Sequence, residues 1–315
     1  MMDASRISVI IPAYNAETTI CEAIESCLAT ADPGPQIIVI DDGSTDGTAG
    51  TVPLHFGGRV VLVSQPNTGR AAARNKGLSL ATGEFVKFLD ADDMVSSEAL
   101  TSQAEFLAAH PDIAVAYGLV EFVSATDPSE RWTPDQPSCP PGNLLPYMVD
   151  DGFLLPLGTL VRREWCERIG GFYVGLPSNE DWDFWLRLAT EGAVFARYPD
   201  DGVVGYYSAR SAGTSTRDPT HLHCGVVTLE RLRARIAHHE ARELHVRRAV
   251  GRWRFGYGRA LIAERRWKAV RQMSRGLLED RRSWDFKLAW IVLGGLFGDA
   301  RAARTISRLQ GRDGN

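Results

Sequence analysis

The sequence lacks the motifs that mark several large enzyme classes. It contains no GxxxxGK[ST] phosphate loop, and no GxGxxG follows the first predicted strand. These absences disfavour P-loop nucleotide hydrolases and dinucleotide-dependent enzymes. It also has no GxSxG nucleophile elbow, which disfavours the serine hydrolases that use that turn.

Cysteine is scarce: there are five cysteines, an odd number, and no two have CxxC spacing. This disfavours a zinc ribbon or a disulfide framework, and free thiols in a reducing compartment are expected. Residues 1–15 lack a signal-peptide pattern. The longest apolar stretch, 286–298, contains Lys287 and is shorter than the roughly 20 residues of a spanning helix. We therefore expect a cytoplasmic protein, with the inner face of the membrane as an alternative location.

Charge is distributed unevenly along the 315 residues, although the net charge is only −4. Residues 225–315 carry 21 Lys and Arg against 9 Asp and Glu, so the preceding 224 residues are strongly acidic. An acidic body argues against nucleic-acid binding. The basic region could meet an anionic membrane surface. The alternative is a solvated helical bundle that packs on the rest of the chain or on a second subunit, as a homodimer.

Residues 1–123 alternate apolar β-type runs with helical patterns. Continuous β-branched runs such as 7–11 and 37–40 are typical of buried parallel strands. Further strands are predicted at 60–63, 85–89 and 114–123, with helices at 16–28, 69–80 and 96–109. This alternation predicts an α/β fold with a mostly parallel sheet flanked by helices. We expect 124–224 to be the second half of the same domain, and 225–315 to be a helical extension.

Acidic clusters follow two of the predicted strands. One begins at Asp41-Asp42-Gly43 and the other is Asp90-Ala91-Asp92-Asp93. Ligands of open parallel sheets bind beyond the carboxyl ends of the strands, and crowded carboxylates there suit Mg²⁺ or Mn²⁺ shared with a substrate diphosphate. The alternative for Asp41-Asp42-Gly43 is a simple turn that binds no ligand. A third cluster, Asn179-Glu180-Asp181-Trp182-Asp183, predicts a general base at a helix start, or else a helix cap.

Six motifs in order resemble those of family 2 glycosyltransferases, over about residues 6–216. They are SVIIPAYN at 8–15, VIDDGSTD at 39–46, NTG with ARNKG at 67–77, FLDADD at 88–93, LVRRE with IGGF at 160–172, and NEDWDFWLR at 179–187. The resemblance implies a GT-A fold and an inverting, metal-dependent transfer from a nucleotide-diphosphate sugar, with a UDP-sugar preferred over dTDP- or GDP-sugars. It makes 1–123 the nucleotide-sugar-binding half of the domain and 124–224 its acceptor-binding and catalytic half. It also implies a saccharide or lipid-linked acceptor, in polysaccharide, glycolipid or glycoconjugate biosynthesis.

The same resemblance assigns roles to individual residues. Asp181 would be the catalytic base, with Glu180 beside it, Trp182 would face the acceptor, and Asp92 would bind the metal. Asp42 would hydrogen-bond the base, and Asp90 would hold the ribose. The donor site as a whole would comprise Pro12, Ala13, Tyr14, Asn15, Asp42, Gly69, Arg74, Asp90, Ala91 and Arg210.

The sequence departs from the family pattern at Arg210, which stands where a histidine is common. An arginine there could neutralise phosphate but would not bind a metal. Two other functions stay open from the sequence. One is a sugar nucleotidyltransferase of related fold, although the sequence has no GxGTR-type loop. The other is a non-catalytic carbohydrate- or membrane-binding protein on the same fold.

Overall fold

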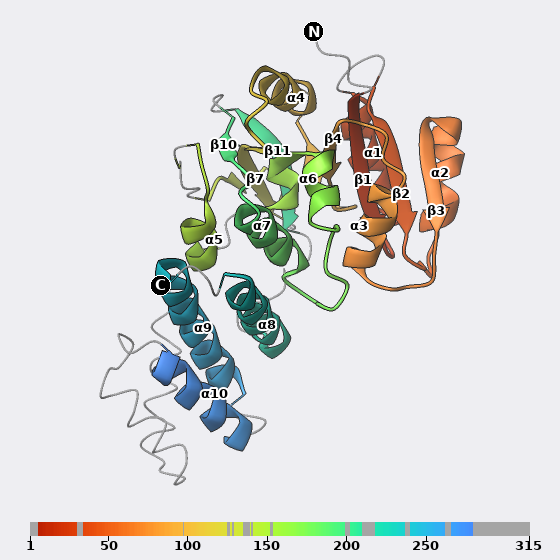
Figure 1. Ribbon diagram of the computed structural model, residues 1–315. Coiled ribbons are helices and arrows are strands. Elements are labelled where there is room, and N and C mark those ends of the chain that lie inside the picture. The colour runs from red at the N-terminus through yellow and green to blue at the C-terminus, as the bar shows by residue number, and fades with distance from the viewer. Residues whose placement is uncertain are drawn as a thin grey trace. The chain divides into compact units, whose positions relative to one another are not determined.

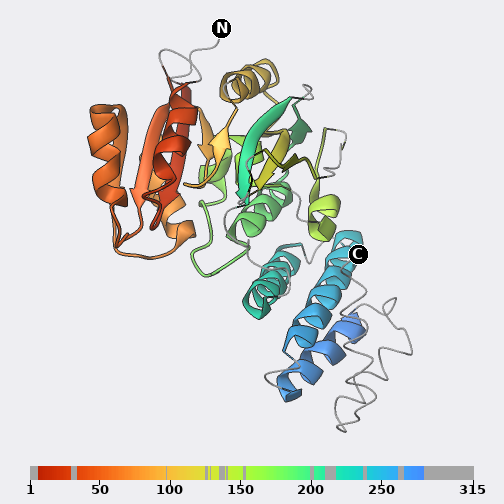
Figure 2. The same cartoon turned by 180° about the vertical axis from the view of Figure 1, so that it is seen from behind.

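The computed structural model describes residues 6–29, 34–96, 98–124, 127, 129–134, 139, 141–151, 154–198, 202–209, 218–236, 240–261 and 266–279. The chain divides into two compact units. The first comprises Met1–Leu176 and Glu180–Gly213, and the second comprises Pro177–Asn179 and Thr214–Asn315. Figures 1 and 2 show the elements of each unit.

A seven-stranded sheet forms the centre of the first unit, with the order β10-β6-β9-β4-β1-β2-β3. The strands are β1 (Ile7–Ala13), β2 (Gln36–Asp41), β3 (Val60–Ser64), β4 (Phe85–Phe88), β6 (Val115–Tyr117), β9 (Thr159–Arg162) and β10 (Phe195–Arg197). Only β9 runs antiparallel to its neighbours β4 and β6. The other pairs are parallel, which confirms the mostly parallel sheet.

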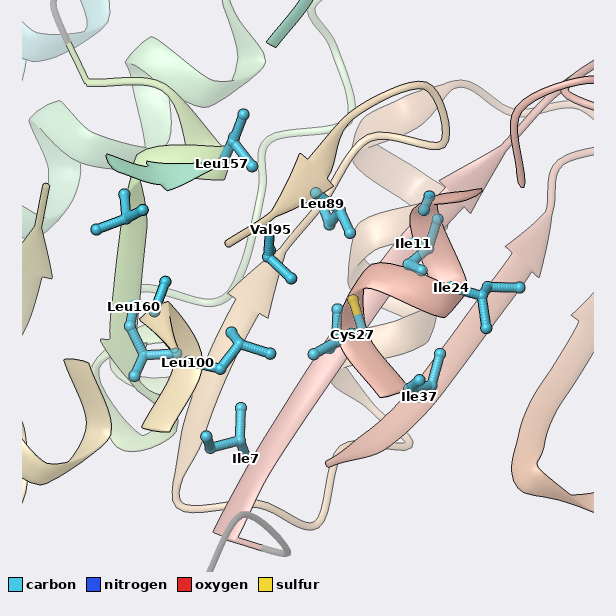
Figure 3. Close-up of a cluster of buried hydrophobic side chains, with 14 of the residues drawn as sticks. Ile7, Ile11, Ile24, Cys27, Ile37, Leu89, Val95, Leu100, Leu157 and Leu160 are labelled. Carbon is cyan, nitrogen blue, oxygen red and sulfur yellow. The ribbon is translucent and has the colours of Figure 1, made fainter. Parts of the chain in front are cut away.

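Helices cover both faces of this sheet. On one face, α1 (Ile20–Leu28), α2 (Thr48–Phe56) and α4 (Ala99–Ala109) pack on alternate residues of the strands. Figure 3 shows Ile24 and Cys27 of α1 beside Ile11 and Ile37 of β1 and β2. On the other face lie α3 (Arg70–Leu78) and α7 (Glu180–Thr190). Phe184 of α7 contacts the Phe88 ring edge-on there. Side-chain alternation along the strands therefore builds a three-layer α/β/α unit.

The predicted strand 114–123 is wrong in one respect, because it is two strands. β6 lies in the central sheet, whereas β7 (Leu119–Ser124) joins a second sheet with β5 (Met94–Val95), β8 (Arg131–Trp132) and β11 (Val203–Ala209). The break falls at Gly118, whose N–H donates to the Gly158 carbonyl. A Cβ at Gly118 would lie 2.4 Å from the Val204 side chain, so only glycine fits there.

Several shorter elements were not predicted. They are α2, α5 (Leu145–Asp151), α6 (Arg163–Arg168), β5, β8 and β10. The first helix also begins at Ile20 rather than Ala16, because Ala16 starts a turn in which its carbonyl accepts from Thr19 and Ile20. None of these differences changes the order of the strands.

The second unit is helical, as expected for residues 225–279. It contains α8 (Pro219–Arg235), α9 (Glu240–Ala260) and α10 (Arg266–Glu279). Asp218 caps α8 by accepting from the Thr220 N–H. Glycines allow close packing, since a Cβ at Gly276 would lie 2.5 Å from the Gly251 carbonyl oxygen. Within the part of the chain that the structure describes, no helix is both long enough and apolar enough to span a bilayer. The apolar stretch 286–298 lies outside the described residues.

Candidate functional site

The carboxyl ends of β1 and β2 are tied together by Asn15. Its side-chain Oδ1 accepts from the Thr45 N–H at 2.8 Å, and its own N–H donates to Ser44 Oγ at 3.0 Å. Asn15 has a φ of +51°, a left-handed conformation that asparagine tolerates well. Of the other residues predicted here, Pro12 and Ala13 are buried at the end of β1, whereas 52% of Tyr14 is exposed. Tyr14 therefore presents a ring at the edge of the sheet.

Asp42 holds the segment that leads into α3. Its Oδ1 accepts from the Thr68 N–H at 3.0 Å, and its Oδ2 accepts from the Gly69 N–H at 2.8 Å. Gln65 Nε2 also donates to Oδ1 at 2.7 Å. Both oxygens of this buried carboxylate thus bond to one loop, and contact between Asp42 and a nucleotide base stays a prediction. The DDG triplet is at the same time a turn, because Asp41 accepts from Ser44 and Gly43 has a φ of +76°.

Arg74 joins three segments that are far apart in sequence. Its Nη2 donates to Asp90 Oδ1 at 2.6 Å, and its Nη1 donates to Glu180 Oε1 at 2.9 Å. The guanidinium also lies over the Phe172 ring, 5.3 Å from its centroid. Arg74 is 1% exposed, so this is a buried charge balanced by two carboxylates. The network brings the end of β4, helix α3 and the start of α7 into one site.

The second acidic cluster carries excess negative charge. Burial would raise the pKa of Asp90, but the cations of Arg74 and Arg70 outweigh it and lower that pKa. Asp93 is buried and accepts from the Ser208 N–H of β11 at 3.0 Å. Burial, followed by the charge of Asp90, raises the pKa of Asp93 well above its usual range. Asp92 is half-buried beside them.

The crowding of carboxyl groups in this cluster decides whether the residues suit a divalent cation. Burial and then the carboxylates of Asp93, Asp92 and Asp90 also raise the pKa of Tyr207. Among the described residues, no three His, Cys, Asp or Glu side chains are grouped as a complete metal cage. Mg²⁺ and Mn²⁺ do not need one, since one or two carboxylates suffice when a diphosphate supplies further oxygens. The residues therefore fit such a cation, and Asp92 as its ligand stays a prediction.

The start of α7 places the third acidic cluster in the site. Asp181 is half-buried, and its Oδ1 accepts from the Trp182 N–H at 2.8 Å. Burial, and then the charge of Glu180, raise the pKa of Asp181 to about 6, against the opposing effect of Arg74. Glu180 is 3% exposed and paired with arginines. Of the two carboxylates, Asp181 is the one available to take a proton.

Other residues of this cluster have structural contacts. Asp183 forms a buried ion pair with Arg187 at 2.7 Å within α7. Trp182 is 7% exposed, and its Nε1 donates to the Met148 carbonyl of α5 at 2.7 Å. Most of the indole is thus covered by protein, and its role toward an acceptor stays a prediction. Arg210 lies outside the described residues.

Three residues of the site were missed from the sequence. Arg70 forms an ion pair with Glu180 at 3.2 Å. Asp93 and Tyr207 contribute to the electrostatics of the acidic cluster. Asp93 could have been found from the sequence, since it belongs to the quoted FLDADD motif. The ion pair of Arg70 could not have been found from the sequence, because nothing near Arg70 indicates that residue 180 lies beside it.

Comparison with known proteins identifies the class. The model of the family described as glycosyl transferase family 2 matches residues 8–170, just over half of the chain. The chain therefore belongs to glycosyl transferase family 2.

Among its relatives is the putative glycosyltransferase EpsE of Bacillus subtilis, which is 32% identical over 200 residues. That match covers 61% of this chain and 69% of EpsE. An uncharacterized glycosyltransferase of Haemophilus influenzae is 40% identical over 109 residues, or 34% of this chain and 44% of the relative. An uncharacterized glycosyltransferase of Rickettsia felis matches over only 31% of its own length. The chain thus spans between about a third and two thirds of these relatives.

Solved structures show the fold. TarS 1–349 of S. aureus in complex with UDP-GlcNAc matches with a TM-score of 0.66 at 21% identity, over 97% of this chain and 92% of that one. The mannosyltransferase PcManGT of Pyrobaculum calidifontis, in complex with GDP-Man and Mn²⁺, matches with a TM-score of 0.54 at 18% identity, over 96% and 83%. These likenesses confirm the GT-A fold.

Proposed function

We propose that this glycosyltransferase moves a sugar from a nucleoside-diphosphate sugar, with a UDP-sugar as the preferred donor class, to an acceptor hydroxyl. The transfer inverts the anomeric centre and depends on Mn²⁺ or Mg²⁺. The observation that carries the proposal is the bridge from Asp90 through Arg74 to Glu180, which links the end of β4 to the start of α7, where Asp181 follows Glu180. The TarS complexes with UDP-GlcNAc and with UDP support the donor class.

In this proposal the residues divide into two roles. Asp181 accepts the proton of the acceptor hydroxyl as that oxygen attacks the anomeric carbon, and general-base help of this kind typically contributes about 10²–10⁴-fold. One base and one displacement invert the centre and leave no covalent sugar–enzyme intermediate. A divalent cation on Asp92 would neutralise charge on the departing diphosphate. Glu180 and Arg74 hold the acidic cluster at 90–93 and the one at 179–183 next to each other.

Calorimetric titration of the full chain with UDP, GDP and dTDP tests the donor side, each with Mn²⁺ and with EDTA. Metal-dependent binding of one nucleotide is the expected result. If no nucleotide binds in either condition, the acidic clusters are structural, and a non-catalytic carbohydrate- or membrane-binding role replaces the proposal. Release of pyrophosphate instead of a nucleoside diphosphate during turnover would indicate a sugar nucleotidyltransferase.

The acceptor belongs to the proposal as a class: a saccharide or lipid-linked hydroxyl compound in polysaccharide, glycolipid or glycoconjugate synthesis. A lipid-linked acceptor would suit peripheral membrane contact through residues 225–315. Part of that basic charge is paired internally, since Arg254 bonds both Glu230 and Glu279. Co-sedimentation with anionic against neutral vesicles tests the membrane contact. Sedimentation of the chain alone tests the homodimer.

A further inference from the structure

Arg70 and Arg74 lie one helical turn apart on α3, but their environments differ. Arg74 is 1% exposed, and it is held by Asp90, Glu180 and the Phe172 ring. Arg70 is 51% exposed, and in the described part of the chain its single recorded ion pair is to Glu180. Arg74 therefore cannot reach a ligand without breaking several buried contacts. Arg70 has guanidinium nitrogens that face solvent.

The position of Arg70 directs its charge toward the acidic site. It is the first residue of α3 and follows Gly69. Side chains on a helix lean toward its N-terminus, which here follows the loop held by Asp42. Arg70 pairs with Glu180, and Glu180 also binds Arg74, which pairs with Asp90. Arg70 is thus a cation within electrostatic range of both the donor-side and the base-side acids.

The Glu180 carboxylate interacts with two arginines at the same time. Its Oε1 accepts a hydrogen bond from Arg74 Nη1 at 2.9 Å and lies 3.2 Å from Arg70 Nε in an ion pair. The carboxylate is 3% exposed, so it needs a cation at all times. If Arg70 moves away, Arg74 remains to balance Glu180. The cost of releasing Arg70 to another anion is correspondingly small.

We propose that Arg70 is a second cationic residue for the diphosphate of the donor: Glu180 holds it over the site, and it pairs with the diphosphate when the nucleotide binds. This inference rests on the proposed function, because it presumes a nucleoside-diphosphate donor. Arginine suits the role, since its planar guanidinium can donate two parallel hydrogen bonds to phosphate oxygens. Arg74 then acts through Glu180 and Asp90, as a positioning residue.

The test compares UDP with uridine, which shares the base and ribose but has no phosphate. Calorimetric titration in Mn²⁺ is made on the full chain as wild type, Arg70→Gln, Arg70→Lys and Lys76→Gln. Lys76 is an exposed cation in the last turn of the same helix, and it is the matched control. Because Arg70→Gln removes a charge-assisted hydrogen bond to phosphate, it is expected to weaken UDP binding by about tenfold or more.

Uridine binding is expected to stay at the wild-type level in every variant, and Arg70→Lys is expected to recover part of the loss for UDP. The inference is overturned if Arg70→Gln binds UDP as tightly as Lys76→Gln does. It is equally overturned if Arg70→Gln loses uridine binding in the same proportion, since that result marks a structural role. If the wild type prefers GDP or dTDP, the same comparison uses that nucleotide and its nucleoside. Absence of any nucleotide binding by the wild type refutes the proposed function itself, which is a separate result.

Discussion

The carboxylate of Asp42, just beyond the end of β2, accepts a hydrogen bond of 2.8 Å from the backbone N–H of Gly69. The two residues lie 27 positions apart. Gly69 has a φ of +91° and directly precedes α3, so the direction in which that helix begins is set by a side chain from another strand. Since α3 carries Arg70 and Arg74, the positions of these two cations depend on this one carboxylate.

Replacement of Asp42 by alanine is therefore expected to lower both stability and nucleotide affinity. The change leaves the N–H groups of Thr68 and Gly69 without their acceptor, at a cost of roughly 2 kcal/mol or more in the free energy of unfolding. Urea denaturation measures the loss. Asp112→Ala removes an exposed carboxylate and is the control. Equal stability of the two variants would show that the loop does not depend on Asp42.

Activity is expected to fall in acid because Asp181 must be ionised to act as a base. Its pKa is raised to about 6, so kcat/KM should be level above that pH and drop about tenfold per unit below it. Asp181→Asn should reduce transfer by about 10²–10⁴-fold while nucleotide binding is kept. Glu191→Gln, an exposed change just past α7, should leave the profile unaltered. Full transfer by Asp181→Asn would show that the base assignment is wrong.

Lys87 should make stability depend on pH in the alkaline range. It is fully buried on β4, and it donates to Gln103 Oε1 at 3.3 Å. Burial lowers its pKa from 10.5 to about 7, against a smaller opposing effect of the neighbouring Cys27. The unfolded chain thus binds more protons between about pH 7 and 10.5, and the free energy of unfolding rises with pH across that window.

Lys87→Met should remove this dependence, which urea denaturation between pH 6.5 and 9 measures. The slope that one such proton contributes is at most about 1.4 kcal/mol per pH unit. Lys76→Met removes an exposed lysine from α3 and should keep the wild-type slope. An identical slope in wild type and Lys87→Met would mean that Lys87 stays charged in the folded protein.

Two ion pairs of the same spacing should differ greatly in their contribution to stability. Arg187 and Asp183 are 6% and 3% exposed, whereas Arg163 and Glu167 are 34% and 53% exposed. Asp183→Ala leaves a buried cation without its carboxylate and should cost about 3–5 kcal/mol. Glu167→Ala should cost about 0–1 kcal/mol. Thermal unfolding of both variants measures the two losses of stability. Similar losses would contradict the expectation that the buried pair contributes more than the exposed one.

The sequence predicted the parts of the fold that depend on local pattern. Runs such as Ile37–Ile40 are apolar at every position because both faces of the strand are covered, and that pattern is readable without a structure. The split at Gly118 was missed, because only the distant Val204 makes a side chain impossible there. The quoted motifs include Arg74 and Glu180, which the structure shows to be paired. Their ion pair, and the part that Arg70 plays in it, depend on tertiary contacts that no local pattern encodes.

The ion pair between Arg74 and Glu180 can form only late in the synthesis of the chain. The two residues are 106 positions apart. At a ribosome's pace of about 5–20 residues per second, the second partner follows the first by about 5–20 s. Once Asp90 has been added, it is the one of the two carboxylate partners available to Arg74 until Glu180 follows. The bridge from Asp90 through Arg74 to Glu180 is consequently incomplete until residue 180 has been added. A ribosome that stalls before residue 180 leaves a half-built site whose buried cation is only partly balanced, and such nascent chains are natural clients for chaperones.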